Sequence, residues 1–248
     1  MHANSFWLVL IFALLAGLAN LVGGAWLART KKISPLFLKY CLAFGSGFLL
    51  AAVFLKMIPI GLEYLKLAPI IILLGYFIIH FFEHTVAPHF HFGEETHLSE
   101  MGVHRAVGLS AFLGLTVHAL FDGVSIGSGF LVTPALGILI FTAIFLHKLP
   151  EGFTMASIIL ASGGTKKQAF QAVVVLGTVT VLGTLLAQAL KPWFAYALSL
   201  SAGVSLYVAA SDLIPEVNQE KGIRMSIMVF VGVGLFFLTE SLLGALGL

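Results

Sequence analysis

Charged residues are scarce in this chain of 248 residues. Asp, Glu, Lys and Arg make up 10% of it and hydrophobic residues 59%, with a mean hydropathy of +1.05, whereas soluble domains are roughly a quarter charged. This composition excludes an ordinary soluble domain and predicts an all-α protein whose surroundings are a lipid bilayer. The formal net charge is +2, and no basic stripe interleaved with aromatic residues is present, so no nucleic-acid partner is expected.

Cysteine is almost absent as well. The single Cys41 lies inside an apolar run, which excludes a disulfide framework or a cysteine-rich zinc cage within one chain. Any metal site must therefore be built from histidine and carboxylate side chains.

Glycine, proline and charged residues divide the chain into eight apolar segments of about the 20 residues that a spanning helix needs. We expect these helices near 5–28, 37–60, 67–87, 107–130, 135–160, 169–190, 193–214 and 226–247, within one transmembrane domain that covers residues 1–248. Most of the 13 Lys and Arg residues fall in alternate loops, beginning with the first, which predicts that both termini lie outside. Short loops suit a plasma membrane or a bacterial inner membrane, and the sequence leaves a homodimer open.

A faint internal repeat relates the two ends of the chain. Its aligned positions are Gly47, Lys56 and Pro59 with Gly203, Asp212 and Pro215, and then Gly75 and Glu83 with Gly232 and Glu240. The matched segments cross the membrane in opposite directions, which is the pattern of an inverted repeat. Segments 107–130 and 135–160 then form a central pair.

The central pair carries matching motifs. His118-Ala-Leu-Phe-Asp122-Gly and His147-Lys-Leu-Pro-Glu151-Gly each place a histidine and an acid four residues apart, and therefore on one helix face. Both motifs lie near the middle of their segments, so the four side chains should meet at one depth. Ionisable groups are costly there unless they face partners, water or an ion.

Imidazoles and carboxylates suit Zn²⁺ and also Fe²⁺, Mn²⁺ or Cd²⁺, and their binding can be reversed. We therefore predict that His118, Asp122, His147 and Glu151 bind a divalent ion as cargo, with no resident cofactor and no catalytic residues. Pro150 lacks an N–H and should kink its helix at the site. The glycine after each acid, Gly123 or Gly152, should allow a neighbouring backbone to approach closely.

A polar loop at 84–105 is rich in histidine and predicted to be cytoplasmic. Its candidate metal ligands are His84, His89, His91 and His97. Such a segment either gathers or senses metal, or is a solvated linker.

The two motifs resemble the fourth and fifth helices of the ZIP (Zrt/Irt-like) metal transporter family. The stretches LAFGSGFLLAAVFLKMIP and SLYVAASDLIPE are also similar to the corresponding helices of that family. The resemblance implies eight helices in a 3+2+3 arrangement with an inverted repeat, and movement of metal toward the cytoplasm. Many members carry polar residues, often ligands of a second ion, where this chain has Ala119 and Lys148. We therefore expect one ion, with Lys148 as its fixed counter-charge.

Two other functions compete with transport of metal. One is an integral-membrane zinc hydrolase, but no His-Glu-x-x-His helix is present and Lys148 is a poor neighbour for a metal-bound hydroxide. The other is a proton-coupled carrier of an organic solute, for which few hydrogen-bonding side chains remain. Metal transport by alternating access, and not an enzymatic reaction, is the predicted function.

Overall fold

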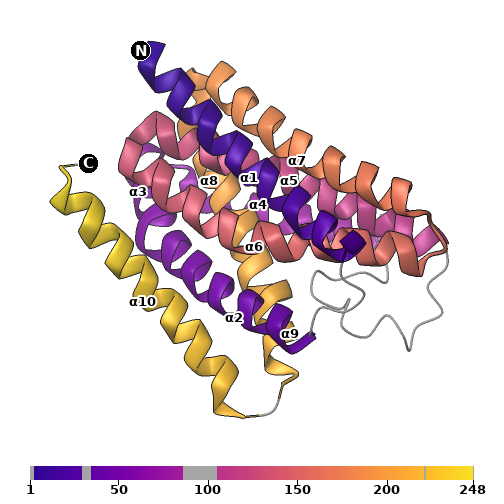
Figure 1. The fold of residues 1–248 in the computed structure, drawn as a ribbon. Coiled ribbons are helices and arrows are strands. Elements are labelled where there is room, and N and C mark those ends of the chain that lie inside the picture. Colours follow the sequence, from indigo (N-terminus) through magenta and orange to yellow (C-terminus); the bar gives the residue numbers. More distant parts are fainter. Residues whose placement is uncertain (1–2, 30–34, 86–104, 221, 248) are drawn as a thin grey trace.

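The computed structural model of the protein describes residues 3–29, 35–85, 105–220 and 222–247 (Figure 1). These residues form helices and turns, without β-strand. In chain order the elements are α1 (Ala3–Arg29), α2 (Pro35–Ala52), η1 (Val53–Met57), α3 (Ile58–Tyr64), α4 (Ala68–Thr85), α5 (Arg105–Val132), α6 (Pro134–Ala161), α7 (Lys166–Ala189), η3 (Lys191–Trp193), α8 (Phe194–Tyr207), η4 (Val208–Leu213), α9 (Ile214–Asn218) and α10 (Ile223–Ala245). Within the described residues, eight stretches are long and apolar enough to cross a membrane. Their ends lie within a few residues of the predicted ones.

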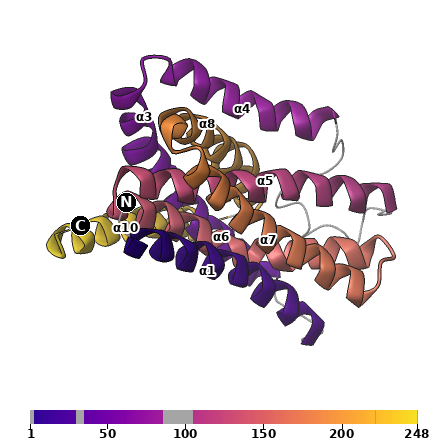
Figure 2. The ribbon, with the colours of Figure 1, turned by 90° about the horizontal axis from the view of Figure 1, so that it is seen from above.

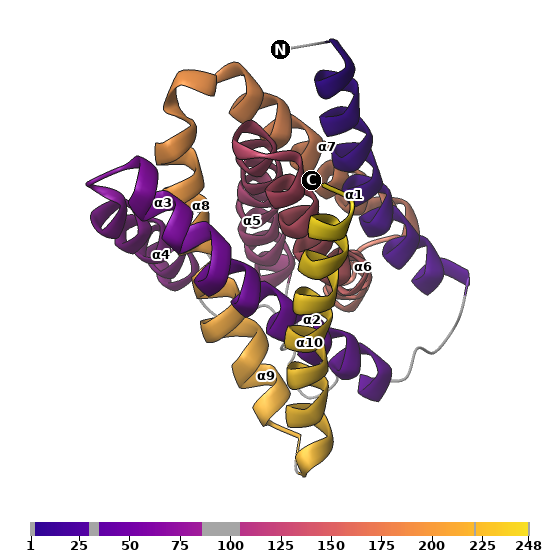
Figure 3. The same ribbon diagram turned by 90° about the vertical axis from the view of Figure 1, so that its left-hand side faces the viewer.

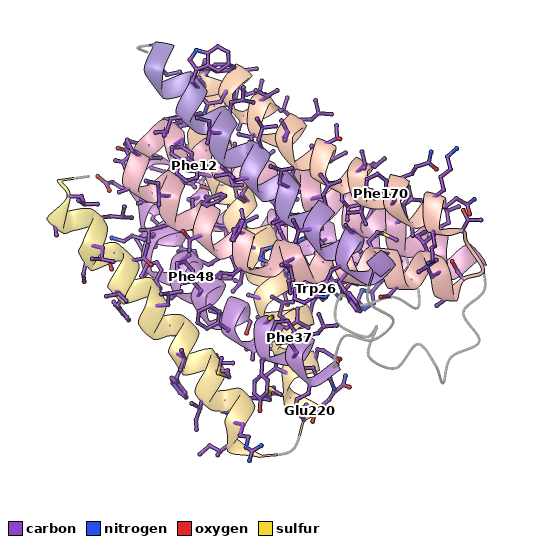
Figure 4. The ribbon with its side chains drawn as sticks, viewed as in Figure 1. Phe12, Trp26, Phe37, Phe48, Phe170 and Glu220 are labelled. Carbon is purple, nitrogen blue, oxygen red and sulfur yellow. The ribbon has the colours of Figure 1, made fainter. Side chains whose placement is uncertain are left out.

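Large apolar side chains cover the outside of the bundle. Phe230 on α10 is 75% exposed and Phe170 on α7 is 49% exposed (Figure 4). A surface of this kind is stable in hydrocarbon, where helices also satisfy their own backbone hydrogen bonds. The start of α1 and the end of α10 lie at the same end of the bundle (Figure 1), as an even number of spans requires.

The helices pack as two groups. α1, α5, α6 and α7 form one group, in which α5 packs most extensively against α7 and α1 against α6. In the other group α4 packs against α8 and α2 against α10, where the buried ring of Phe48 meets Phe236 edge-on. Figure 2 shows α4, α8, α5, α7 and α1 in succession, and Figure 3 shows α2 beside α10. The groups meet where α2 contacts α6 and α8 contacts α5.

Glycine contacts within the second group follow the predicted repeat. A Cβ on Gly47 of α2 would meet the carbonyl oxygen of Val229 on α10, and a Cβ on Gly203 of α8 would meet that of Ile72 on α4. The contacts made by Gly75 and Gly232 are related in the same way, with Leu200 and Phe44 respectively. The pair α2 and α10 and the pair α8 and α4 thus pack through glycines at matching positions, which supports the inverted repeat. The 3+2+3 division of the chain stays a prediction.

The two repeat-related spans also contain the same irregularity. π-Helical turns at η1 and η4 interrupt them, and Pro59 or Pro215 follows shortly after each turn. Lys56 and Asp212, which the repeat aligns, both lie in these turns. π-Helical turns are rare and concentrate at functional sites, and proline adds another missing backbone hydrogen bond. These spans are therefore locally widened at equivalent positions.

Candidate metal centre

A tight helical hairpin brings the two motifs to one depth. Thr133 caps α6 by accepting a backbone N–H at 3.1 Å, and Pro134 occupies the first helical position, where its missing N–H costs nothing. His118 precedes the end of α5 by about as many residues as His147 follows the start of α6. Because both helices rise equally per residue, the two histidines lie at similar distances from the turn.

The four motif side chains meet inside this hairpin. His118, Asp122, His147 and Glu151 are all buried, and one ligand atom from each lies within 4.8 Å of the others. Asp122 Oδ2 is 3.0 Å from His118 Nε2 and 3.4 Å from His147 Nε2. Glu151 Oε2 is 3.6 Å from His118 Nε2. The structure thus brings together the residues that the motifs singled out.

The orientation of His147 prepares one ring nitrogen for an ion. Its Nδ1 lies 3.0 Å from the carbonyl oxygen of Ala143, which can only accept a hydrogen bond, so Nδ1 carries the hydrogen. In the neutral ring Nε2 is then an acceptor, and it faces Asp122 Oδ2. Two acceptors turned toward each other are suited to holding a cation between them.

Lys148 supplies the one positive charge of the cluster. Its ammonium is fully buried and donates to Glu151 Oε2 at 2.7 Å and to Oε1 at 2.9 Å. It also lies 2.7 Å from Asp122 Oδ2, so it bridges α6 and α5. One buried ammonium between two carboxylates offsets much of the cost of placing these charges in hydrocarbon.

The glycine that follows each acid lies where a second helix crosses. A Cβ on Gly123 would meet the carbonyl oxygen of Thr180 on α7, and a Cβ on Gly152 would meet that of Asn20 on α1. The predicted close approach of a neighbouring backbone is therefore present at both glycines. α7 supports the motif of α5, and α1 supports the motif of α6.

Sequence reasoning missed one residue of this site. Asn20 on α1 is fully buried, and its Nδ2 donates to Glu151 Oε1 at 3.4 Å. The signal available in the sequence was a lone amide in an otherwise apolar segment. Ala119 is buried but offers no ligand atom, and α6 continues as a helix through the buried Pro150.

Of the loop histidines, only His84 lies among the described residues, and it does not join this cluster. His84 lies exposed at the end of α4, with its Nδ1 2.8 Å from the carbonyl oxygen of His80. His89, His91 and His97 fall outside the described residues.

Two further sets of ion pairs among the described residues lie outside this cluster. Lys39 on α2 is buried, donates to Glu220 at 2.7 Å and lies 3.7 Å from Glu216 on α9. Lys56 in η1 pairs with Glu240 on α10, and both of these side chains are partly exposed. These pairs join the span of α2 and η1 to neighbouring elements of the second group.

The fold and this site define a polytopic helical membrane protein with an ionisable cluster inside its bundle. The sequence model of the family described as ZIP Zinc transporter matches residues 93–240, more than half of the chain. This protein belongs to the ZIP zinc transporter family.

Individual relatives match over 44% to 57% of this chain. The zinc transporter ZIP9 of Micropogonias undulatus is 32% identical over 124 residues, which is 44% of this chain and 39% of that protein. The human zinc transporter ZIP10 is 28% identical over 151 residues, 57% of this chain and 17% of the relative. The zinc transporter zipt-7.1 of Caenorhabditis briggsae is 29% identical over 161 residues, 53% of this chain and 39% of the relative. The chain spans less than half the length of each of these curated relatives.

Proposed function

We propose that this protein transports divalent transition-metal ions, zinc first among them, across a membrane toward the cytoplasm. The observation that supports this most is the buried cluster of His118, Asp122, His147 and Glu151 on two spanning helices. These ligands bind Zn²⁺ reversibly and also accept Fe²⁺, Mn²⁺ or Cd²⁺. The direction rests on the family resemblance, and the ion is cargo.

Zinc uptake into proteoliposomes tests this function. His147→Ala and Glu151→Ala each remove a proposed ligand, and we expect each to lower the initial rate of uptake about a hundredfold or more, because even the loss of a residue that only supports a ligand costs about 10- to 100-fold at metal sites. The matched control is Thr178→Val, at an exposed hydroxyl that bonds only within α7. Equal uptake by His147→Ala and the control would contradict the proposal.

The site holds one ion, because Lys148 occupies the space between the two carboxylates that a second ion would need. An ammonium this close repels a further divalent cation strongly in a medium of low dielectric constant. Metal analysis of the purified protein should give one zinc per chain, rising above one in Lys148→Ala. Two zinc ions in the unaltered protein, or unchanged single-ion binding in Lys148→Ala, would contradict this stoichiometry.

Alternating access then requires one helix group to move against the other. The close backbone contacts of Gly123, Gly152, Gly47 and Gly203 all lie inside a group, whereas α2 and α6, which join the groups, meet at Gly45 with room for a Cβ. Gly45 of α2 faces His147 at van der Waals distance. We therefore propose that α1, α5, α6 and α7 move together with the ion.

Hydrolysis is the weaker candidate. Both carboxylates of the site contact Lys148, so neither is available as the general base that would activate a metal-bound water. If the protein released a hydrolysis product from a lipid or a peptide and carried no ions, that result would nonetheless favour a hydrolase.

The remaining predictions concern the arrangement in the membrane. We propose one transmembrane domain with both termini outside, the 84–105 loop in the cytoplasm, and a plasma or bacterial inner membrane as its location. Introduced cysteines in a Cys41→Ser background should react with an impermeant maleimide at the termini, and at residue 164 only after permeabilisation. A homodimer is proposed as well, and light scattering in detergent tests it.

A further inference from the structure

α1 contributes one polar side chain to an otherwise apolar span. Among its described side chains, Asn20 is the one amide, hydroxyl or charged group, and it is fully buried. An amide inside a spanning helix is costly unless it has a partner. Its partner is the Glu151 carboxylate, 3.4 Å from Nδ2.

The backbone holds this amide in place. Gly152, next to Glu151, lies against the carbonyl oxygen of Asn20, and Gly23 lies against that of Leu149. The two helices therefore touch on both sides of the contact. Because asparagine is short, its amide stays beside Glu151 as long as α1 and α6 remain packed.

The amide also has an acceptor that nothing in the described part of the chain uses. The carboxylate oxygens of Glu151 only accept, so the NH₂ group must face them and Oδ1 must face elsewhere. Asn20 Oδ1 is buried and has no hydrogen-bond partner among the described residues. A buried acceptor of this kind is unfavourable unless another state of the site satisfies it.

We infer that Asn20 is a neutral fifth member of the metal site. Nδ2 keeps the Glu151 carboxylate oriented when the ion binds, and Oδ1 accepts a hydrogen bond from a water molecule that the ion carries. This inference rests on the proposed transport function. Thr180 takes the corresponding place on α7, since its carbonyl oxygen lies against Gly123 as that of Asn20 lies against Gly152, but its hydroxyl bonds to a carbonyl of its own helix.

Co²⁺ binding to the full-length protein in detergent, followed by visible absorption, tests this role. We expect Asn20→Leu to weaken Co²⁺ binding about tenfold, as expected for one lost hydrogen bond to a charged group, and to change the absorption band. In proteoliposomes KM for zinc should rise by a similar factor while the maximal rate changes little. Thr180→Val, equally buried, is the control and should leave affinity and band unchanged.

Asn20→Asp separates a role in the site from a role in packing. It keeps the shape and an oxygen toward the ion, so Co²⁺ affinity should stay at or above that of the unaltered protein. Unchanged Co²⁺ affinity and absorption in Asn20→Leu, or equal loss of affinity in both Asn20 variants, would overturn the inference.

Whether or not the inference holds, His147→Ala still abolishes binding if the transport function is correct. Absence of Co²⁺ binding and zinc uptake in the unaltered protein would instead defeat the transport function itself. If Asn20→Leu does not fold, the affinity of Asn20→Asp decides the outcome.

Discussion

The two halves of the candidate metal site share a scaffold but differ in chemistry. On one side α7 crosses α5 at Gly123, and on the other α1 crosses α6 at Gly152, with a carbonyl oxygen against each glycine. The α5 half offers His118 and Asp122. The α6 half offers a histidine and an acid in the same places but adds Lys148, and α1 adds Asn20.

This difference separates packing from function. Backbone packing depends on small residues at the crossing points, and these recur in both halves. The positive charge and the amide come from the α6 half alone, where both contact Glu151, and the ammonium also reaches Asp122 on α5. Replacing the crossing glycine should therefore change stability by about the same amount in either half. Replacing a charged residue should change it by different amounts in the two halves.

The largest expected effect comes from blocking the crossings. Gly123→Val and Gly152→Val each force a side chain into a backbone carbonyl, and we expect each to lower the free energy of unfolding by about 3 kcal/mol or more. Denaturation in detergent measures this. Gly234→Val on α10, where a Cβ meets nothing within 4 Å, is the control. A large effect at only one of the two crossings would show that the two crossings do not contribute equally to stability.

A comparable but asymmetric effect is expected from the ammonium. Lys148→Ala leaves two carboxylates without their counter-charge and should cost about 3 kcal/mol without metal. Ala119 occupies the equivalent position on α5, so adding Ala119→Lys should recover part of the lost stability. Thermal unfolding with and without zinc provides the measurement. No recovery would mean that the two positions are not equivalent.

The smallest effect concerns a single hydrogen bond. Thr184 on α7 donates to the carbonyl oxygen of Gly123 at 3.0 Å, while Gly24, which lies four residues after Asn20 as Thr184 lies four after Thr180, has no side-chain donor. Thr184→Val should lower stability by about 1 kcal/mol and leave zinc uptake unchanged. The exposed Thr178→Val is the reference, and equal stability of the two variants would show that the bond contributes nothing.

Much of the fold could be predicted because hydrocarbon imposes strict rules on sequence. Each spanning helix needs a long apolar run, so eight such runs predicted eight helices with nearly correct ends. Depth could be predicted as well, because His118 and His147 each lie near the middle of a run. Their convergence followed from the cost of isolated charge in the bilayer, together with a turn too short to separate the helices.

Contacts between helices distant in sequence could not be predicted in this way. Nothing in the local pattern says that Asn20 meets Glu151, since periodicity describes a single helix and not its neighbour. The bridging of both carboxylates by Lys148 likewise depends on how α5 faces α6.

The number of spans, the four candidate ligands and their depth follow from the sequence, because apolar length and the cost of buried charge act along one helix at a time. Which helix supports which motif, how the two groups divide, and that an amide from α1 reaches Glu151 depend on the tertiary structure. Those features depend on where backbones cross, and crossings are a property of pairs of helices.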